Sequence, residues 1–127
     1  MNQELLKEAA GLHQEVERLE QHVGLMENEI VEMDKFHGAL SSIGSPSEKN
    51  VLAPLGKGIF ASAKIDSNEL FVEVGAGIIV KKNPEEVKEI VESRIESLQK
   101  SKTLISQQIE LKFSALQEII QELEKQR

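Results

Sequence analysis

A stripe of mostly apolar residues recurs in alternating steps of four and three through the first third of this 127-residue chain. Its members are Leu5, Ala9, Leu12, Val16, Leu19, Val23, Met26, Ile30, Met33, His37 and Leu40. Such steps keep one narrow stripe on the same side of a helix, which is the pattern of a coiled-coil seam. A seam this narrow cannot fill a globular core. The sequence therefore predicts an elongated helical arm over residues 3–42, whose function lies in its surfaces rather than in a catalytic pocket.

A second stripe of the same kind occupies the last third of the chain. Before it, Asn83 is a favoured helix cap, Pro84 suits the first helical position, and Glu86 can complete a capping box. The stripe consists of Val91, Ile95, Leu98, Lys102, Ile105, Ile109, Lys112, Leu116, Ile119 and Leu123. We therefore expect a second helix over residues 84–126. Each helix would be about 60 Å long at a rise of about 1.5 Å per residue.

The segment between the helices changes to a β pattern. Four short runs rich in β-branched and apolar residues, 51–53, 59–65, 69–74 and 78–80, are predicted strands. The connectors 54–58, 66–68 and 75–77 contain the Gly, Pro, Asn and Asp residues typical of hairpin turns. The expected fold is α+β: one domain over residues 1–127, in which two β-hairpins over 50–82 separate two coiled-coil helices.

Charges beside the seams indicate that the two helices fold back on each other. In a parallel homodimer of the first helix, Glu15 would face Glu20 of its mate, and like charges disfavour that pairing. In an antiparallel pair, Lys102 instead lies between Glu20 and Glu27, and Lys112 lies near Glu15. Each exposed ion pair contributes at most about 1 kcal/mol, so these pairs indicate the register more than they predict stability.

The two hairpins need more partners than the chain itself offers. Isolated hairpins are marginal in water, and their outer strands leave backbone N–H and C=O groups unpaired. The simplest solution is pairing with hairpins of other subunits in a closed β-barrel. The sequence therefore predicts an obligate oligomer. The expected assembly residues are Pro54, Leu55, Gly56, Gly58, Phe60, Val72, Val74, Gly75, Gly77, Ile79 and Val80.

Near both termini, over residues 3–14 and 109–124, apolar residues exceed what a seam requires. An apolar stripe wider than its partner leaves exposed surface, which often marks a binding site. A broad helix contact, or frayed ends without a role, would explain the pattern equally simply. The candidate binding residues at this tip are Leu5, Leu6, Leu12, Phe113, Leu116, Ile119, Ile120 and Leu123.

Composition and motifs argue against several other functions. The net charge is −7 and no cluster of five Lys or Arg occurs, so nucleic acid and anionic membranes are poor partners. The chain has no Cys, and no two of its three His lie three or four residues apart, so no metal site is expected. The sequences 56–58 and 75–77 lack the phosphate-binding loop pattern and are expected to be turns. Nothing suggests an activated nucleophile, so we expect neither an enzyme nor a cofactor.

No targeting segment is expected either. The first residues carry no basic stretch of the kind that opens a signal peptide. No apolar run reaches the roughly 18 residues that a membrane-spanning helix needs.

The two turn regions resemble motifs of one protein family. Residues 52–60, LAPLGKGIF, resemble the V-P-L-G-x-G-x-F stretch of alpha-class prefoldin subunits, and residues 74–83, VGAGIIVKKN, resemble their V-G-x-G-x-x-V-x-K stretch. The four predicted strands also match the alpha class. The short form of the chain is more similar to archaeal subunits than to eukaryotic ones.

The resemblance implies a cytosolic hexamer of two alpha-class and four beta-class subunits, in which the strands form β-barrels and the coiled coils hang as tentacles. Such complexes hold unfolded polypeptides at the tentacle ends without ATP and pass them to a group II chaperonin. Two alternatives stay open at this point. One is a prefoldin relative that polymerises into filaments, and the other is a coiled-coil adaptor in another complex.

Overall fold

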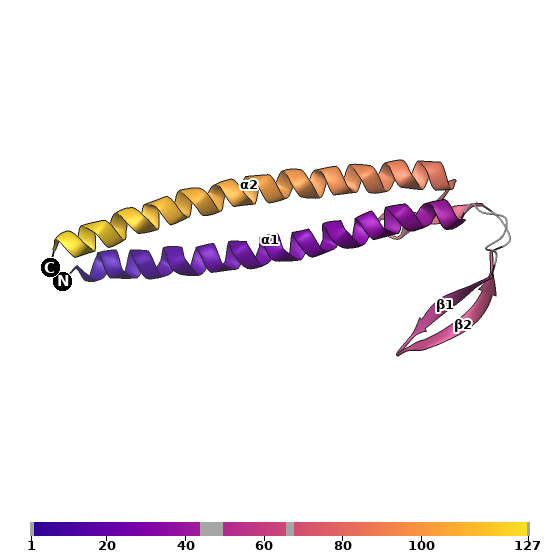
Figure 1. Ribbon diagram of the computed structural model, residues 1–127, viewed down its shortest axis with the longest axis horizontal. Helices are drawn as coiled ribbons and strands as arrows, with labels where there is room; N and C mark the ends of the chain where they lie inside the picture. The colour runs from indigo at the N-terminus through magenta and orange to yellow at the C-terminus, as the bar shows by residue number, and fades with distance from the viewer. Residues whose placement is uncertain (1, 44–49, 66–67, 127) are drawn as a thin grey trace. The chain divides into compact units, whose positions relative to one another are not determined.

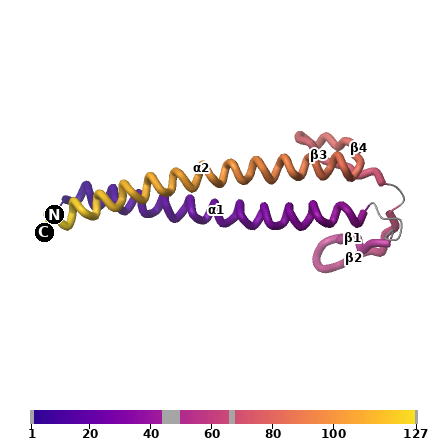
Figure 2. The backbone as a smooth tube through the Cα atoms, turned by 45° about the horizontal axis from the view of Figure 1, so that its top comes forward, coloured from indigo at the N-terminus to yellow at the C-terminus, as the bar shows by residue number. Residues whose placement is uncertain are grey.

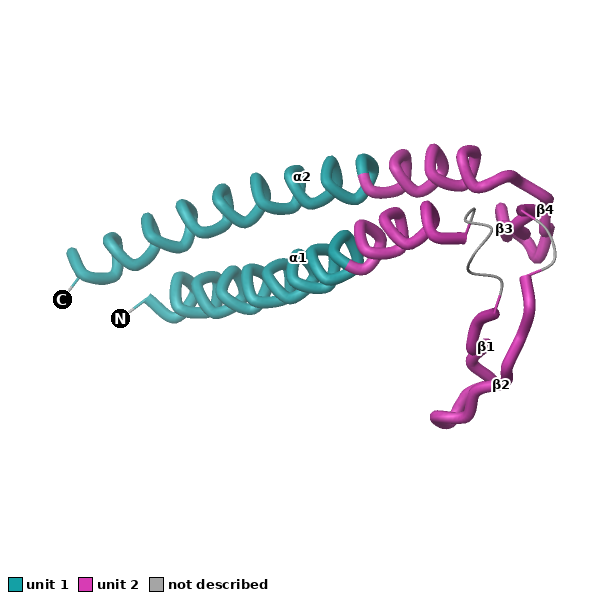
Figure 3. Tube along the Cα trace, turned by 45° about the vertical axis from the view of Figure 1, so that its right-hand side comes forward, with its two compact units in different colours: residues 1–31, 96–127 teal, residues 32–95 magenta. Residues whose placement is uncertain are grey.

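The computed structural model describes residues 2–43, 50–65 and 68–126. The elements, in order, are α1 (Gln3–Ile43), β1 (Asn50–Gly56), β2 (Ile59–Lys64), β3 (Leu70–Gly75), β4 (Ile78–Lys82) and α2 (Pro84–Lys125) (Figure 1). This order confirms the predicted sequence of helix, two β-hairpins and helix. The chain divides into two compact units (Figure 3). We call residues 1–31 and 96–127 the helical unit, and residues 32–95 the mixed unit.

Both helices begin at an asparagine cap. The Asn2 side-chain oxygen accepts hydrogen bonds from the backbone N–H groups of Glu4, at 3.1 Å, and Leu5, at 3.2 Å. At the start of α2, the Asn83 side-chain oxygen accepts from the Glu86 N–H at 2.8 Å, and Glu86 Oε1 accepts from the Asn83 N–H at 3.2 Å. This reciprocal pair is the predicted capping box.

In the helical unit, α1 and α2 lie side by side and antiparallel (Figures 1 and 2). Every seam residue predicted within this unit is buried or half-buried. Two ion pairs fix the register: Lys102 Nζ lies 3.3 Å from Glu27 Oε1, and Lys112 Nζ lies 2.5 Å from Glu15 Oε2. The antiparallel register predicted from the flanking charges is therefore confirmed.

The mixed unit has a small core of its own. Leu40, Val87 and Val91 are buried together where α1 and α2 approach each other. The partly buried side chains around them are Met33, Ile43, Leu70, Val72 and Ile95. One face of the β3–β4 hairpin therefore packs on the helices of this unit. A seam residue of α1 also pairs here with α2, because His37 Nε2 lies 2.8 Å from Glu92 Oε1.

The strands form two separate two-stranded antiparallel sheets, β1–β2 and β3–β4. Each hairpin turns through three consecutive left-handed residues, with φ of 110°, 58° and 76° over 56–58 and 131°, 49° and 77° over 75–77. Glycine occupies the outer positions of both turns because positive φ costs it little. The turn predicted over 75–77 is confirmed, whereas the connector predicted over 54–58 is shorter than expected, because β1 continues to Gly56 and Pro54 pairs with Phe60. The third predicted turn, 66–68, falls mainly on Asp66 and Ser67, which lie outside the described residues.

The first helix extends to Ile43, one residue beyond the predicted end at Ser42. The breaker sequence that follows, from Gly44 to Pro46, lies outside the described residues.

Candidate functional site

The structure divides the eight candidate tip residues into two groups. Five lie in the seam between the helices and are buried or half-buried: Leu5, Leu12, Leu116, Ile119 and Leu123. The other three stay exposed, with 42% of Leu6, 49% of Phe113 and 45% of Ile120 accessible to solvent. The seam residues hold the two helices together, and the other three leave apolar surface in solvent.

The three exposed residues share one side of the helical unit. Each follows a seam position by one residue: Leu6 follows Leu5, and Ile120 follows Ile119. Phe113 follows the seam lysine in the same way and lies one heptad before Ile120. Because α1 and α2 run antiparallel, one step beyond the seam leads to the same side of the pair on both helices. Exposed Ala10 extends this surface along α1. We call Leu6, Ala10, Phe113 and Ile120 the tip patch.

Both ends of the described chain lie at the same end of the helical unit as the tip patch (Figure 1).

Two further leucines are exposed on α2, away from the tip patch. Leu104 is 61% and Leu111 is 73% accessible, and one heptad separates them. Each comes two positions after a seam residue, so they lie on the opposite flank of α2 from Phe113. The candidate tip set omits both. Their heptad spacing outside the seam is the signal that could have identified them.

The candidate assembly residues on the hairpins also separate by side. Leu55, Phe60, Val74 and Ile79 are all more than half exposed. Val72 instead packs against the core of the mixed unit. Val80 pairs with Val72 across the hairpin and is half-buried like it. The period-two alternation of a strand separates Val72 and Val80 from Ile79, whereas Val74 lies at the irregularity in the strand register beside the turn.

Several exposed apolar strand residues lie outside the predicted assembly set. These are Val51, Leu52, Ile59, Phe71 and Ile78. With them, the β1–β2 hairpin carries exposed apolar side chains on both of its faces, since Leu52 and Val51 alternate along β1. The outer face of β3–β4 carries Phe71 beside Ile79, with Lys81 Nζ 6.0 Å from the Phe71 ring centre. Such surface is typical of strands that another chain covers.

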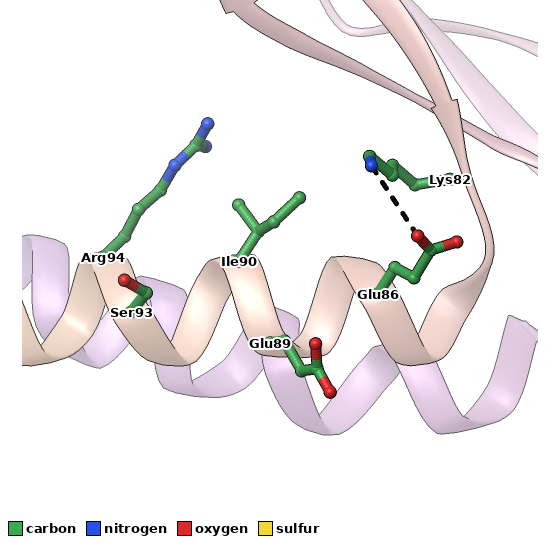
Figure 4. Close-up of a pocket in the computed structure, with 6 residues that line it drawn as sticks. All are labelled: Lys82, Glu86, Glu89, Ile90, Ser93 and Arg94. Atoms are coloured by element: carbon green, nitrogen blue, oxygen red, sulfur yellow. Dashed lines mark ion pairs between the residues drawn. The ribbon is translucent and has the colours of Figure 1, made fainter.

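Two of the hollows among the described residues belong to the mixed unit. One of about 430 Å³ is lined by Lys82, Glu86, Glu89, Ile90, Ser93 and Arg94 (Figure 4). Its charges are balanced, because Lys82 and Arg94 are matched by two glutamates of the lining. Lys82 Nζ lies 3.6 Å from Glu86 Oε2, and Arg94 Nη2 donates to the Glu73 backbone carbonyl at 3.5 Å. The other, of about 450 Å³, is mostly apolar and lies beside the Leu40–Val91 core.

Across residues 2–43, 50–65 and 68–126, no three His, Asp or Glu side chains cluster as metal ligands would. Neither of the helices, as far as the structure describes them, carries an apolar stretch long enough to cross a membrane. The chemistry of the described surface is therefore that of exposed apolar patches among carboxylates.

Comparisons with known proteins agree with this geometry. The family model for prefoldin subunits matches residues 12–126. Prefoldin subunit alpha of Methanococcus maripaludis is 31% identical over 86% of this chain and 77% of its own length. Prefoldin subunit alpha of Thermofilum pendens is 30% identical over 91% of this chain and 86% of its own length.

Among solved structures, a chain of filamentous PFD from Methanocaldococcus jannaschii, determined by cryo-electron microscopy, superposes with a TM-score of 0.81. The match covers 96% of this chain and 99% of that one at 21% identity, so it establishes the common fold. The order of helix, two β-hairpins and helix, together with this superposition, defines the fold of a prefoldin-type subunit. The chain belongs to the prefoldin family, as the matched residues and the alpha-subunit relatives show. This membership is consistent with a chaperone role.

Proposed function

We propose that the chain is an alpha-class subunit of a chaperone complex that holds unfolded polypeptides without ATP and passes them to a group II chaperonin in the cytoplasm. The observation that carries the proposal is the tip patch. Leu6, Phe113 and Ile120 are exposed on one side of a seam that is otherwise closed. An apolar surface that stays in solvent, on a helical unit otherwise rich in charged residues, suits the binding of apolar segments of another chain.

Each tip binds weakly and the complex binds tightly. Burying a whole apolar side chain contributes about 1.5–3 kcal/mol, and the three large side chains of the patch are already about half covered. One patch therefore yields only a transient contact. Several tips joined through one base raise the local concentration of binding sites for the same client. The net charge of −7 keeps such arms apart and soluble.

The hairpins supply the base of the complex. Their exposed apolar residues and their two-stranded sheets support pairing with strands of other subunits in closed β-barrels. The partners that we propose are beta-class prefoldin subunits, four of them with two copies of this chain. Assembly would cover Leu55, Phe60 and Ile79, and the turns over 56–58 and 75–77 would set the strand register.

A matched pair of double variants tests the tip assignment. Phe113→Ser with Ile120→Ser removes two patch residues one heptad apart on α2. Leu104→Ser with Leu111→Ser removes two leucines at the same spacing on the opposite flank. In the assembled complex, the first variant should lose most suppression of the aggregation of an unfolded client, and the second should retain it. Equal loss in both, with assembly intact by mass measurement, would reject the tip patch.

Deletion of the first and last dozen residues is the coarser version of this experiment. The truncated chain should still assemble, because the hairpins are intact, and should no longer suppress aggregation. Retained suppression would place the binding surface elsewhere.

A filament-forming subunit is the second candidate. The similar chain from M. jannaschii belongs to filamentous PFD, and both hairpins of this chain expose apolar strands. Electron microscopy of the chain, alone and with a beta-class mate, distinguishes closed particles from fibres. A coiled-coil adaptor of another complex would instead fail to retain any beta-class subunit or chaperonin in a pull-down.

A further inference from the structure

The tip patch lies within two continuous stripes of exposed side chains. On α1 the stripe is Leu6, Ala10, His13 and Glu17, and on α2 it is Glu110, Phe113, Gln117, Ile120 and Glu124. The members follow steps of three and four, so each stripe stays on one side of its helix. Each member also lies one position after a seam residue, so the two stripes flank the seam on the same side.

Carboxylates border this surface and no Lys or Arg belongs to either stripe. On α2, Glu110 is three residues before Phe113, and Glu124 is four residues after Ile120. On α1, Glu17 closes the stripe and its Oε1 lies 2.9 Å from Nε2 of His13. Residues at these spacings are neighbours on a helix surface, about 5–6 Å apart between Cβ atoms. The apolar centre is therefore flanked by negative charge at both ends.

We propose that the tip patch prefers unfolded segments in which a short apolar run is flanked by Lys or Arg. The inference rests on the proposed function and names its class of ligand. Apolar side chains of the client would cover Phe113 and Ile120, and its cationic side chains would lie beside Glu110 and Glu124. Complementary charge at the rim of an apolar contact selects partners and speeds their association more than it strengthens binding.

The spacing of the carboxylates sets the length of the preferred segment. Glu110 and Glu124 are 14 residues apart on α2, which corresponds to about 21 Å along the helix. An extended polypeptide covers that distance in about six or seven residues. The preferred ligand therefore has an apolar run of about four or five residues between two cationic residues.

Three peptides of about eight residues, with one apolar centre and flanks of Lys, Ser or Glu, test the preference. The chain has no Cys, so Gln121→Cys, labelled with a fluorophore before assembly, reports binding at this chain's own tip. In the assembled complex at low salt, the Lys peptide should bind roughly three- to tenfold more tightly than the Ser peptide, and the Glu peptide should bind most weakly. The difference should shrink as the ionic strength rises, because the carboxylates are exposed.

A matched pair of triple variants locates the charge effect. Glu17→Gln, Glu110→Gln and Glu124→Gln remove the border carboxylates. Glu8→Gln, Glu118→Gln and Glu122→Gln remove three exposed carboxylates from the other flank of the same helices with the same change in net charge. Only the first set should abolish the preference for the Lys peptide while leaving binding of the Ser peptide unchanged.

The outcomes separate the two proposals. If the Ser peptide does not bind at all, the proposed function itself fails. It also fails if the substitutions Phe113→Ser and Ile120→Ser together leave peptide binding unchanged. If the Ser peptide binds at the patch but Lys flanks bring no gain, or both triple variants weaken the Lys peptide equally, the charge preference is wrong and the tip binds by apolar contact alone.

Discussion

Lys112 of α2 joins Glu15 of α1 across 97 residues of sequence, with Nζ 2.5 Å from Oε2. Lys112 occupies a seam position, where an apolar residue is the rule, and its side chain reaches out to the flank of the opposite helix. A charged residue at such a position specifies register, since its charge is satisfied only when the partner carboxylate is at the right level. A seven-residue slip in one direction would bring Lys112 to His22, which the pair disfavours, whereas a slip in the other direction would bring it to Glu8, so the pair by itself opposes only the first slip.

The first prediction concerns the stability of the coiled coil at low pH. The hydrogen bond and the charge of Lys112 hold the pKa of Glu15 below its ordinary value of 4.5. A carboxyl whose pKa is lower when folded stabilises the fold above its unfolded pKa and loses that contribution as the pH falls through its folded pKa. Stability of the coiled coil should therefore decrease below about pH 4.5, partly through this pair.

Urea unfolding of wild type, Glu15→Gln, Lys112→Met and the double variant, at neutral pH and near pH 3, measures this contribution. The coupling between the two substitutions should be smaller near pH 3 than at neutral pH, because acid protonates Glu15. A coupling that does not change with pH would mean that the pair is not ionised as described.

The elements that depend on local spacing could be predicted from the sequence. Both helices, the capping box at Asn83 and Glu86, the two glycine turns and the antiparallel register are of this kind, because periodicity and flanking charge determine them. The solvent exposure of individual side chains at the tip could not be predicted in the same way. Leu116 and Ile120 are both large aliphatic residues in the same stretch of sequence. Leu116 is half-buried because it occupies a seam position, whereas Ile120, one residue beyond a seam position, is exposed.

The hairpins show the same limit. Val72 and Ile79 both belong to apolar strands that resemble one another in sequence. Val72 packs on the helices of the mixed unit, whereas Ile79 is exposed. Which face of a strand is buried depends on how its hairpin packs against the helices. This packing is a tertiary property, which the alternation of residues along the strand does not determine.

The second prediction concerns the glycines of α1. Gly11, Gly24 and Gly38 lie within the helix, and a Cβ added at any of them meets nothing within 4 Å. Replacing each by Ala should therefore stabilise the protein by up to about 1 kcal/mol, because Gly is a poor helix former. Thermal unfolding of the triple variant should show a higher midpoint than wild type. As a control, Gly58→Ala should lower the midpoint, since φ there is 76°.

The third prediction concerns the start of α2. Asn83→Ala removes the acceptor for the Glu86 N–H and should cost about 1 kcal/mol. Asn83→Asp keeps an acceptor oxygen at the same place and should restore most of the loss. The denaturant concentrations at the unfolding midpoints of the two variants measure the loss and its recovery. Equal destabilisation by Ala and Asp would show that the side chain acts through something other than the cap.

The fourth prediction concerns the core of the mixed unit. Leu40 is the one fully buried large side chain among the described residues, and it packs with Val87 and Val91. Leu40→Ala should cost about 2–5 kcal/mol, because it removes buried methyl groups and leaves a cavity. Leu25→Ala makes the same chemical change on α1 where 69% of the side chain is exposed, so it should change stability by less than about 0.5 kcal/mol. Chemical unfolding of the two variants measures the difference, and similar losses would contradict the burial of Leu40.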